Sequence, residues 1–198
     1  MKTFNASAAI SKGWEITKNN LGLLVVMTII VMLIPTIGQT ILKTFGFGQG
    51  LASLASTLLS VFLSIGMMRV YLDLLTGKKA DFNTLFSGAD AFFDYFIAYI
   101  IYMIMVGVGM IFLILPGIYL ALKYQYVFPL IIDKKMSAFD AIKKSGELTQ
   151  GNIFNLFGLA VLLFLVILAG LLALGVGVLI AAPVASLAYV HVYKQLSK

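Results

Sequence analysis

Long apolar segments alternate with short polar segments along the chain, and six of them are candidates for membrane-spanning helices. A spanning helix needs roughly 20 predominantly apolar residues to cross about 30 Å of hydrocarbon. The six segments are Leu21–Leu42, Leu51–Leu75, Tyr95–Leu115, Ile118–Ile132, Ile153–Leu174 and Val178–Tyr193. Short connections at Lys43–Gly50, Pro116-Gly117 and Gly175–Gly177 join them in pairs. This pattern predicts an all-α polytopic membrane protein with six transmembrane helices arranged as three hairpins.

The composition supports a membrane protein and excludes several kinds of site. The chain is 61% hydrophobic and 11% charged, with a mean hydropathy of +1.04, whereas soluble domains are about 45–50% apolar and about 25% charged. It has no cysteine and a single histidine, His191, so disulfides, thiolate chemistry and His-rich metal sites are excluded. No phosphate loop, dinucleotide fingerprint or nucleophile elbow occurs, and we predict no cofactor.

The lysines orient the predicted spans. The formal net charge is +6 and the sequence pI is about 9.5, which in a membrane protein points to cytoplasmic loops and anionic headgroups rather than to nucleic acid. With the N-terminus inside, lysines 2, 12, 18, 78, 79, 134, 135, 143, 144, 194 and 198 all fall inside, and only Lys43 falls outside. By the positive-inside rule we predict a multi-pass protein of the inner or plasma membrane with both termini in the cytoplasm.

The fourth segment, Ile118–Ile132, is short for a span, because its helix would be only about 22 Å long. If it did not cross, the last two spans would invert and the lysines that follow the segment would lie outside. Crossing preserves the charge bias, so we keep six spans as the prediction.

Two polar segments repeat one pattern, each just before a hairpin. Residues 9–21 align without gaps on residues 141–153, with the shared pattern A-I-x-K-x-x-E-[IL]-T-x-x-N-[LI]. The repeated positions are Lys12, Glu15, Thr17 and Asn20 in the first copy and Lys144, Glu147, Thr149 and Asn152 in the second. Asn5 or Ser7 is expected to cap the first copy, and Ser137 with Asp140 forms a capping pattern for the second. Each copy is predicted to be a short cytoplasmic amphipathic helix.

A looser copy at residues 82–88 precedes the middle hairpin. The chain is therefore predicted to be a single integral membrane domain, 1–198, built from repeat-like units at 5–77, 78–132 and 137–198. Each unit is one short cytoplasmic helix followed by one hairpin. Because the two clear copies enter the membrane from the same side, the repeat is predicted to be parallel rather than inverted.

Several motifs resemble those of the YciC-like bacterial inner-membrane proteins, and this resemblance extends over most of the chain. They are Leu115–Lys123, Phe128–Asp133, Ala141–Ser145, Thr149–Asn152, Arg69–Asp73 and Leu85–Gly88. The same motifs are similar to the membrane domain attached to some glycerophosphodiester phosphodiesterases. The resemblance implies a six-span membrane protein of unassigned function and hints at lipids, while the chain has no room for the soluble catalytic domain of those phosphodiesterases.

Two sets of residues have both a functional and a structural interpretation. Glu15 and Glu147 are either paired carboxylates for general acid–base chemistry or lysine-paired residues on surface helices. We favour the second, because no nucleophile, metal ligands or histidine accompany them. A stripe of small residues recurs every four positions on the second segment, at Ala52, Ser56, Ser60 and Ser64. It is either a polar pore lining or a close helix-packing seam, and the lack of charge in it favours the seam.

Local hydrogen bonding accounts for the remaining polar positions. The threonine and asparagine of each repeat copy mark a junction between a short helix and a span, where such residues favour caps. Arg69 and Asp73 are spaced i,i+4 near the inner end of the second span, and we predict that they pair there.

Lys123 is the one charged residue placed well inside a predicted span. It lies about 9–10 Å past Pro116-Gly117 along the fourth helix, where an unpaired charge is costly. Either its long stem carries the ammonium outward to the headgroups, or the ammonium binds an anionic lipid headgroup or substrate. In the second case Tyr119, Tyr124 and Tyr126 are expected to flank the bound group. The sequence favours the first interpretation, and the second stays open as the alternative.

The sequence favours a non-enzymatic integral membrane protein that interacts with lipids, maintains the envelope or supports a partner. The expected partners are membrane lipids, with another membrane protein or a second copy of the chain as further candidates, and no nucleic acid. The alternative is a small transporter or channel for an anionic or lipid-like substrate, although no carboxylate lies at mid-membrane, where ion-coupled carriers usually need one. A membrane-embedded lipid enzyme that uses Glu15 and Glu147 is the third hypothesis.

Overall fold

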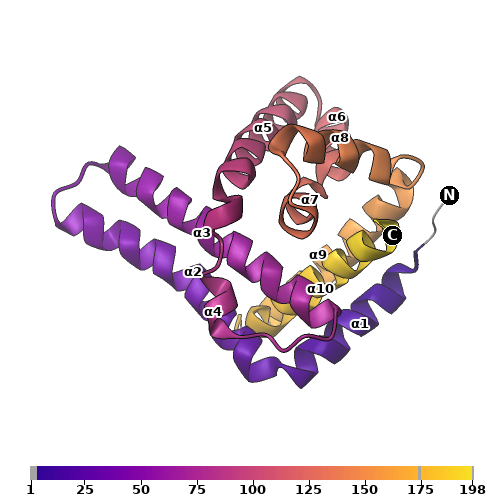
Figure 1. The fold of residues 1–198 in the computed structure, drawn as a ribbon, viewed down its shortest axis with the longest axis horizontal. Coiled ribbons are helices and arrows are strands. Elements are labelled where there is room, and N and C mark those ends of the chain that lie inside the picture. Colours follow the sequence, from indigo (N-terminus) through magenta and orange to yellow (C-terminus); the bar gives the residue numbers. More distant parts are fainter. Residues whose placement is uncertain (1–3, 174, 198) are drawn as a thin grey trace.

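The computed structural model describes residues 4–173 and 175–197, and all regular structure in this part of the chain is helical (Figure 1). The helices are α1 (Ala6–Asn19), α2 (Leu21–Thr44), α3 (Gln49–Leu75), α4 (Phe82–Leu85), the 3-10 turn η1 (Ala89–Ala91), α5 (Phe92–Phe112), α6 (Ile114–Tyr124), α7 (Val127–Lys134), α8 (Ala138–Thr149), α9 (Ile153–Leu172) and α10 (Val178–Leu196). The prediction of an all-α protein is confirmed. Leu174, the predicted end of the fifth segment, lies outside the described residues, as do Lys2 and Lys198.

Five helical segments are long and apolar enough to cross a membrane. They are Leu21–Thr44, Gln49–Leu75, Phe82–Phe112, Ile114–Lys134 and Ile153–Leu172. Large apolar side chains point outward from them: Ile111, Leu115 and Phe154 are 83%, 79% and 92% exposed. Such surfaces suit lipid far better than water, so the chain is a multi-pass membrane protein. α10, the predicted sixth span, is not among the five, because polar residues occupy its C-terminal half.

The turn between α5 and α6 lies at Leu113, so its predicted position at Pro116-Gly117 was wrong. Leu113 has an extended conformation, with φ −163° and ψ 140°. Pro116 lies in the first turn of α6, where the missing N–H costs no helical hydrogen bond. Gly117 serves packing, because a Cβ added to it would lie 2.8 Å from the backbone nitrogen of Met110 on α5. Proline is compatible with the start of a helix as well as with a turn, and packing decided between them.

The fourth predicted segment consists of two helices, α6 and α7, separated by Gln125 and Tyr126. Together they extend over 21 residues, about 31 Å if straight. The segment is therefore longer than the sequence pattern suggested. Pro129 again lies in the first turn of its helix, α7, and does not interrupt it.

Each short polar helix packs on the second helix of another hairpin. α1 lies along α10, α4 lies against α3, and α8 lies against α6 and α7 (Figure 1). The backbones approach closely at glycines. A Cβ added to Gly13 of α1 would lie 2.5 Å from the carbonyl oxygen of Val184, and one added to Gly66 of α3 would collide with the backbone of Leu85. These contacts bury α10 near the centre of the helices, where Leu187 is fully buried.

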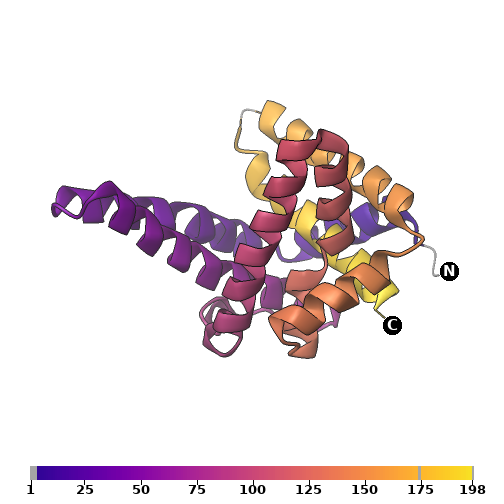
Figure 2. The same cartoon turned by 90° about the horizontal axis from the view of Figure 1, so that it is seen from above.

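The α2–α3 hairpin extends away from the other helices (Figures 1 and 2). Its base contributes Leu24 and Ile65 to the core, both 0% exposed, whereas Phe45 at its tip is 78% exposed. α5 also contacts α3 but leaves this contact in a different direction (Figures 1 and 2). The two hairpins therefore diverge from a shared base.

Candidate functional site

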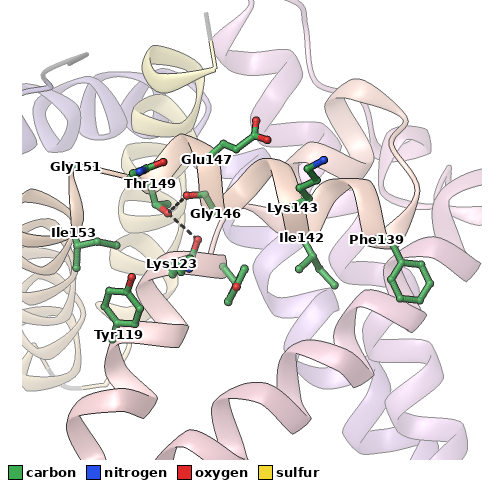
Figure 3. A pocket seen from close by; sticks show the side chains of 12 residues that line it. Tyr119, Lys123, Phe139, Ile142, Lys143, Gly146, Glu147, Thr149, Gly151 and Ile153 are labelled. Carbon is green, nitrogen blue, oxygen red and sulfur yellow. Dashed lines mark hydrogen bonds between the residues drawn. The ribbon is translucent and has the colours of Figure 1, made fainter.

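A pocket of about 570 Å³ lies where α6, α8 and the start of α9 meet (Figure 3). α6 contributes Tyr119, Lys123 and Tyr124, and α9 contributes Ile153. α8 and the turn after it line the rest, with Phe139, Ile142, Lys143, Gly146, Glu147, Thr149, Gln150 and Gly151. The pocket thus combines two lysines, two tyrosines and one glutamate with apolar side chains.

The end of α6 is tied to α8 through hydroxyl groups. The Thr149 hydroxyl donates to the carbonyl oxygen of Lys123 at 2.9 Å, and the Ser145 hydroxyl donates to the same oxygen at 3.1 Å (Figure 3 draws the first bond). The backbone N–H of Tyr126 donates in turn to the Ser145 oxygen at 3.2 Å. Carbonyls at a helix end lack helical partners, and in a membrane they cannot turn to water. α8 therefore supplies the partners that allow the break between α6 and α7.

The second carbonyl at this break also has a side-chain partner. The Tyr189 hydroxyl of α10 donates to the carbonyl oxygen of Gln125. Two different helices thus satisfy the backbone at the break, which fixes its position relative to α8 and α10.

The ammonium of Lys123 lies beside two aromatic rings and pairs with no carboxylate among residues 4–173 and 175–197. Its Nζ is 5.7 Å from the Tyr119 ring centroid and 5.4 Å from that of Tyr124. Cation–π contacts of this kind stabilise an ammonium by about 0.5–2 kcal/mol. Three of the four residues predicted for a lysine site therefore come together.

Tyr126, the fourth, faces another part of the molecule. It is fully buried, and its ring lies 5.2 Å from that of Tyr189 and 5.8 Å from that of Tyr193. Because α6 ends at Tyr124, the helical spacing that relates Tyr119 to Lys123 does not continue to Tyr126. Tyr126 belongs to the core and not to the pocket.

Glu147 does not neutralise Lys123, because it pairs with Lys144. Their Nζ and Oε2 atoms are 2.9 Å apart, and this hydrogen bond holds the pKa of the Glu147 carboxyl below its usual range. Lys143 has no carboxylate partner within the part of the chain that the structure describes. The pocket accordingly carries excess positive charge.

The two repeat copies have matching local contacts. Lys12 pairs with Glu15 at 3.0 Å, as Lys144 pairs with Glu147 at 2.9 Å. Asn5 and Ser137 occupy equivalent positions, and each accepts a backbone hydrogen bond at the start of its helix. The two glutamates do not share a site, because Glu147 lines the pocket and Glu15 does not.

The end of each repeat copy shows one similarity and one difference. The backbone N–H of Asn20 donates to the Thr17 carbonyl at 3.1 Å, and that of Asn152 donates to the Thr149 carbonyl at 3.0 Å. The Asn20 side chain donates to the carbonyl of Ile16 at 2.9 Å. The Thr149 hydroxyl is hydrogen-bonded, whereas the buried Thr17 hydroxyl has no partner among the described residues. The second copy therefore has a polar attachment that the first one lacks.

The predicted Arg69–Asp73 pair is not present. Arg69 bonds Asp90 at 2.5 Å and the Ser87 carbonyl, while Asp73 pairs with Lys78 at 3.3 Å. Arg69 precedes Asp73 on the helix, which is the weaker order for an i,i+4 pair. The segment before α5 folds back over α3 and offers Arg69 better acceptors, which helical spacing alone did not indicate.

The stripe of small residues on α3 forms contacts with α2. The Ser56 hydroxyl donates to the Pro35 carbonyl at 3.0 Å, and the Ser60 hydroxyl donates back to the Ser56 carbonyl at 2.9 Å. The first bond links the two helices at Pro35, and the small side chains of the stripe permit this close approach. Ala52 is fully buried, in agreement with a packing seam, whereas Ser56, Ser60 and Ser64 also line a cavity of about 230 Å³.

The sequence interpretation missed the contribution of α8 to the pocket. Phe139, Ile142, Lys143, Gly146, Glu147 and Gln150 recur at intervals of three and four, which is the signature of one helix face. That periodicity was a usable signal for a shared face. No signal in the sequence indicated that this face of α8 lies next to Lys123, because the contact joins residues more than twenty positions apart.

A comparison with known protein families identifies one whose model matches this chain. A family model described as the membrane domain of glycerophosphoryl diester phosphodiesterase matches residues 91–195, which include the whole pocket. Uncharacterised proteins of Mycobacterium bovis and Mycobacterium tuberculosis are each 26% identical over 162 residues, covering 80% of this chain and 48% of the relative. The chain thus spans about half the length of the curated relatives it matches. No solved structure matches it.

Proposed function

The chain belongs to the family of glycerophosphoryl diester phosphodiesterase membrane domains, and from this we propose that it is a non-enzymatic membrane domain whose pocket at Lys123 binds an anionic lipid headgroup. The observation that carries the proposal is the ammonium of Lys123, which lies in a spanning segment without a carboxylate partner in the described chain. An unpaired charge within a membrane-spanning segment is costly, and such residues mark functional sites. A lipid phosphate would supply the missing counter-charge.

The walls of the pocket fit a lipid headgroup. Lys143 adds a second ammonium from α8, and Gln150 adds an amide donor. Phe139 is 71% exposed on the same face of α8 and adjoins the apolar surface of the spanning helices. A headgroup at Lys123 would therefore keep its chains in the bilayer.

A binding role accounts for the polar groups better than catalysis does. Glu147 is engaged with Lys144 and is not poised to accept a proton at neutral pH. The described pocket residues include neither a histidine nor an activated nucleophile. We infer that the domain acts by holding lipid, in envelope maintenance or in support of a partner, and that its partners are lipids and membrane proteins.

We further infer six spans in the inner membrane, with both termini in the cytoplasm. α10 is the sixth span in this proposal. Its buried position explains its lower hydropathy, because residues such as Tyr189 and Tyr193 face other helices and not lipid. The lysine distribution supplies the orientation.

The proposal includes a threefold parallel repeat, with units made of α1–α3, α4–α7 and α8–α10. The matched caps and ion pairs of α1 and α8 support it. So does the order of contacts: α4 packs on α3 and α8 packs on α6 and α7, in each case in the preceding unit, and α1 packs on α10 of the last unit. A parallel repeat of this kind has its axis along the membrane normal.

Replacing Lys123 by methionine tests the headgroup site. Lys123→Met removes the charge but keeps an unbranched side chain, so the fold is expected to persist. We expect phosphatidylglycerol and cardiolipin bound to the purified protein, measured by native mass spectrometry, to fall about tenfold or more, as for loss of a charged hydrogen bond. Lys78→Met is the control, because Lys78 is exposed and pairs with Asp73 away from the pocket. Equal anionic lipid in Lys123→Met and wild type, with both folded, would refute the site.

A further inference from the structure

Two adjoining cavities follow α3 and share no lining residue with the Lys123 pocket. One, of about 230 Å³, lies between α3 and α5, and the other, of about 380 Å³, lies among α2, α3, α5 and α10. Ser64 and Tyr95 line both cavities. From Ser56 to Tyr71, the lined stretch of α3 is about 22 Å long, which is most of the thickness of a bilayer core.

The lining is polar but uncharged. Among the described residues, both cavities are lined by serine, threonine, tyrosine, methionine, valine and alanine, without a lysine, arginine, histidine, aspartate or glutamate. An ion would lose its hydration there without meeting a counter-charge, at a high cost in free energy. The lining therefore selects against charged ligands.

The lining hydroxyls include donors that are not used within the protein. Tyr95 is only 8% exposed, and its hydroxyl has no hydrogen-bond partner among residues 4–173 and 175–197. The hydroxyls of Ser64 and Tyr99 also lack partners in that part of the chain. In a bilayer, a donor without a protein partner has no water to bond to either. A ligand that carries acceptor oxygens would supply hydrogen-bond partners for these three donors.

The cavities face the bilayer. Ser56, Thr57, Ser60 and Tyr99 are half-buried, so the smaller cavity opens between α3 and α5. These helices diverge beyond their contact (Figures 1 and 2). The flexible side chains of Met32, Met67 and Met68 line the deeper cavity, and methionines adapt readily to chains of varied shape. A ligand from the membrane thus has a lateral entrance.

We propose that these cavities bind the ester-linked glycerol portion of a membrane lipid, with its ester oxygens accepting hydrogen bonds from Tyr95, Tyr99 and Ser64. Ester oxygens accept and do not donate, which matches the unused donors. The volumes hold the glycerol diester portion, and the acyl chains extend into the bilayer between α3 and α5. This lipid site is separate from the pocket at Lys123 and does not depend on it.

Photo-crosslinking tests the ligand class. The protein in nanodiscs is irradiated with diacylglycerol, or in a parallel arm with phosphatidylglycerol, each carrying a diazirine on one acyl chain. We expect labelled peptides from α3 and α5, and about a threefold to tenfold loss of labelling in Tyr95→Phe, as for loss of one hydrogen bond. Labelling by either lipid supports the ester site, and the arm that labels identifies the source.

A matched control makes the result specific. Tyr102→Phe makes the same change two turns along α5, where the hydroxyl donates to the Ala121 carbonyl and lines neither cavity. This variant is expected to be labelled as strongly as wild type. Lys123→Met is also expected to be labelled as strongly as wild type, so the present proposal can be refuted without refuting the headgroup proposal, and the reverse. Equal labelling of Tyr95→Phe and wild type, with intact size-exclusion and circular dichroism profiles, overturns the lipid site.

A second measurement separates a lipid site from an aqueous pore. The chain has no cysteine, so Ser64→Cys introduces a single thiol at the junction of the cavities. We expect this thiol to react with a lipid-soluble maleimide and to resist a membrane-impermeant one added on both sides. Reaction with the impermeant reagent, or with neither reagent, contradicts a lipid-accessible site.

Discussion

At the scale of single residues, the side chain and the backbone of Lys123 have different roles. Its ammonium lies beside Tyr119 and Tyr124, and its carbonyl accepts hydrogen bonds from Ser145 and Thr149. The side chain thus faces the pocket while the backbone holds α8 in place. A change at Thr149 therefore affects the support of the site without removing its charge.

We predict that Thr149→Val destabilises the protein by about 0.5–1.5 kcal/mol, because the part-buried carbonyl of Lys123 loses one of its two donors. Thr17→Val is the matched control at the equivalent repeat position, where the buried hydroxyl has no partner in the described residues. It is expected to be neutral or slightly stabilising. SDS-titration unfolding in mixed micelles measures both, and equal losses in the two variants would contradict the assigned hydrogen bonds.

At the scale of helices, the short helices determine where the hairpins meet. α4 has only four residues, yet its backbone lies directly against Gly66 of α3. α1 approaches α10 in the same way through Gly13. Small residues permit such close backbone contacts between membrane helices, where packing contributes much of the stability. These glycines are therefore expected to tolerate no side chain.

Gly66→Ala is predicted to destabilise the protein by about 1–3 kcal/mol or more, since its methyl group would collide with the Leu85 backbone. Gly107→Ala provides the control. Gly107 lies inside α5 with open space around it, so alanine there is expected to stabilise by about 0.5–1 kcal/mol through helix propensity. Thermal unfolding in detergent measures the difference. The α3–α4 contact is wrong if the two variants change stability in the same direction.

At the scale of the whole molecule, the divergent hairpins and their shared base explain where the pocket and the cavities lie. The pocket at Lys123 lies where a short helix crosses two spans, and the hydroxyl-lined cavities lie where two hairpins separate. Each of these sites is lined by several helices and not by one alone. Their accessibility therefore depends on the topology in the membrane.

The proposed topology predicts which single cysteines react from outside the cell. Phe47→Cys, in the connection between α2 and α3, is expected to react with a membrane-impermeant maleimide in intact cells. Asp140→Cys and Ser197→Cys are expected to react only after the membrane is opened, because both lie on the cytoplasmic side in the six-span arrangement. Labelling of either from outside would remove α10 or the α6–α7 segment from the list of spans.

The sequence by itself determined the class of protein and the approximate extent of most apolar helices. The apolar segments are long enough to span a bilayer. In lipid, the backbone groups of such a segment must form hydrogen bonds with one another, so the segment folds as a helix. Local signals also sufficed for Asn5 and Ser137 as caps and for the lysine–glutamate contacts of both repeat copies. These interactions join residues within one turn of helix, so spacing alone specifies them.

Only the tertiary structure decided which distant groups meet. Proline is compatible both with a loop between helices and with the first turn of a helix. The contact between Gly117 and α5 places Pro116 in the first turn of α6. Arg69 forms its salt bridge with Asp90 and not with Asp73, because the chain before α5 folds over α3. Lys123 gained its pocket from α8, and Tyr95 its cavity from α2, α3 and α10. Apolar helices pack through shape and small residues that many pairings share, so a sequence pattern shows which faces are available but not which of them touch.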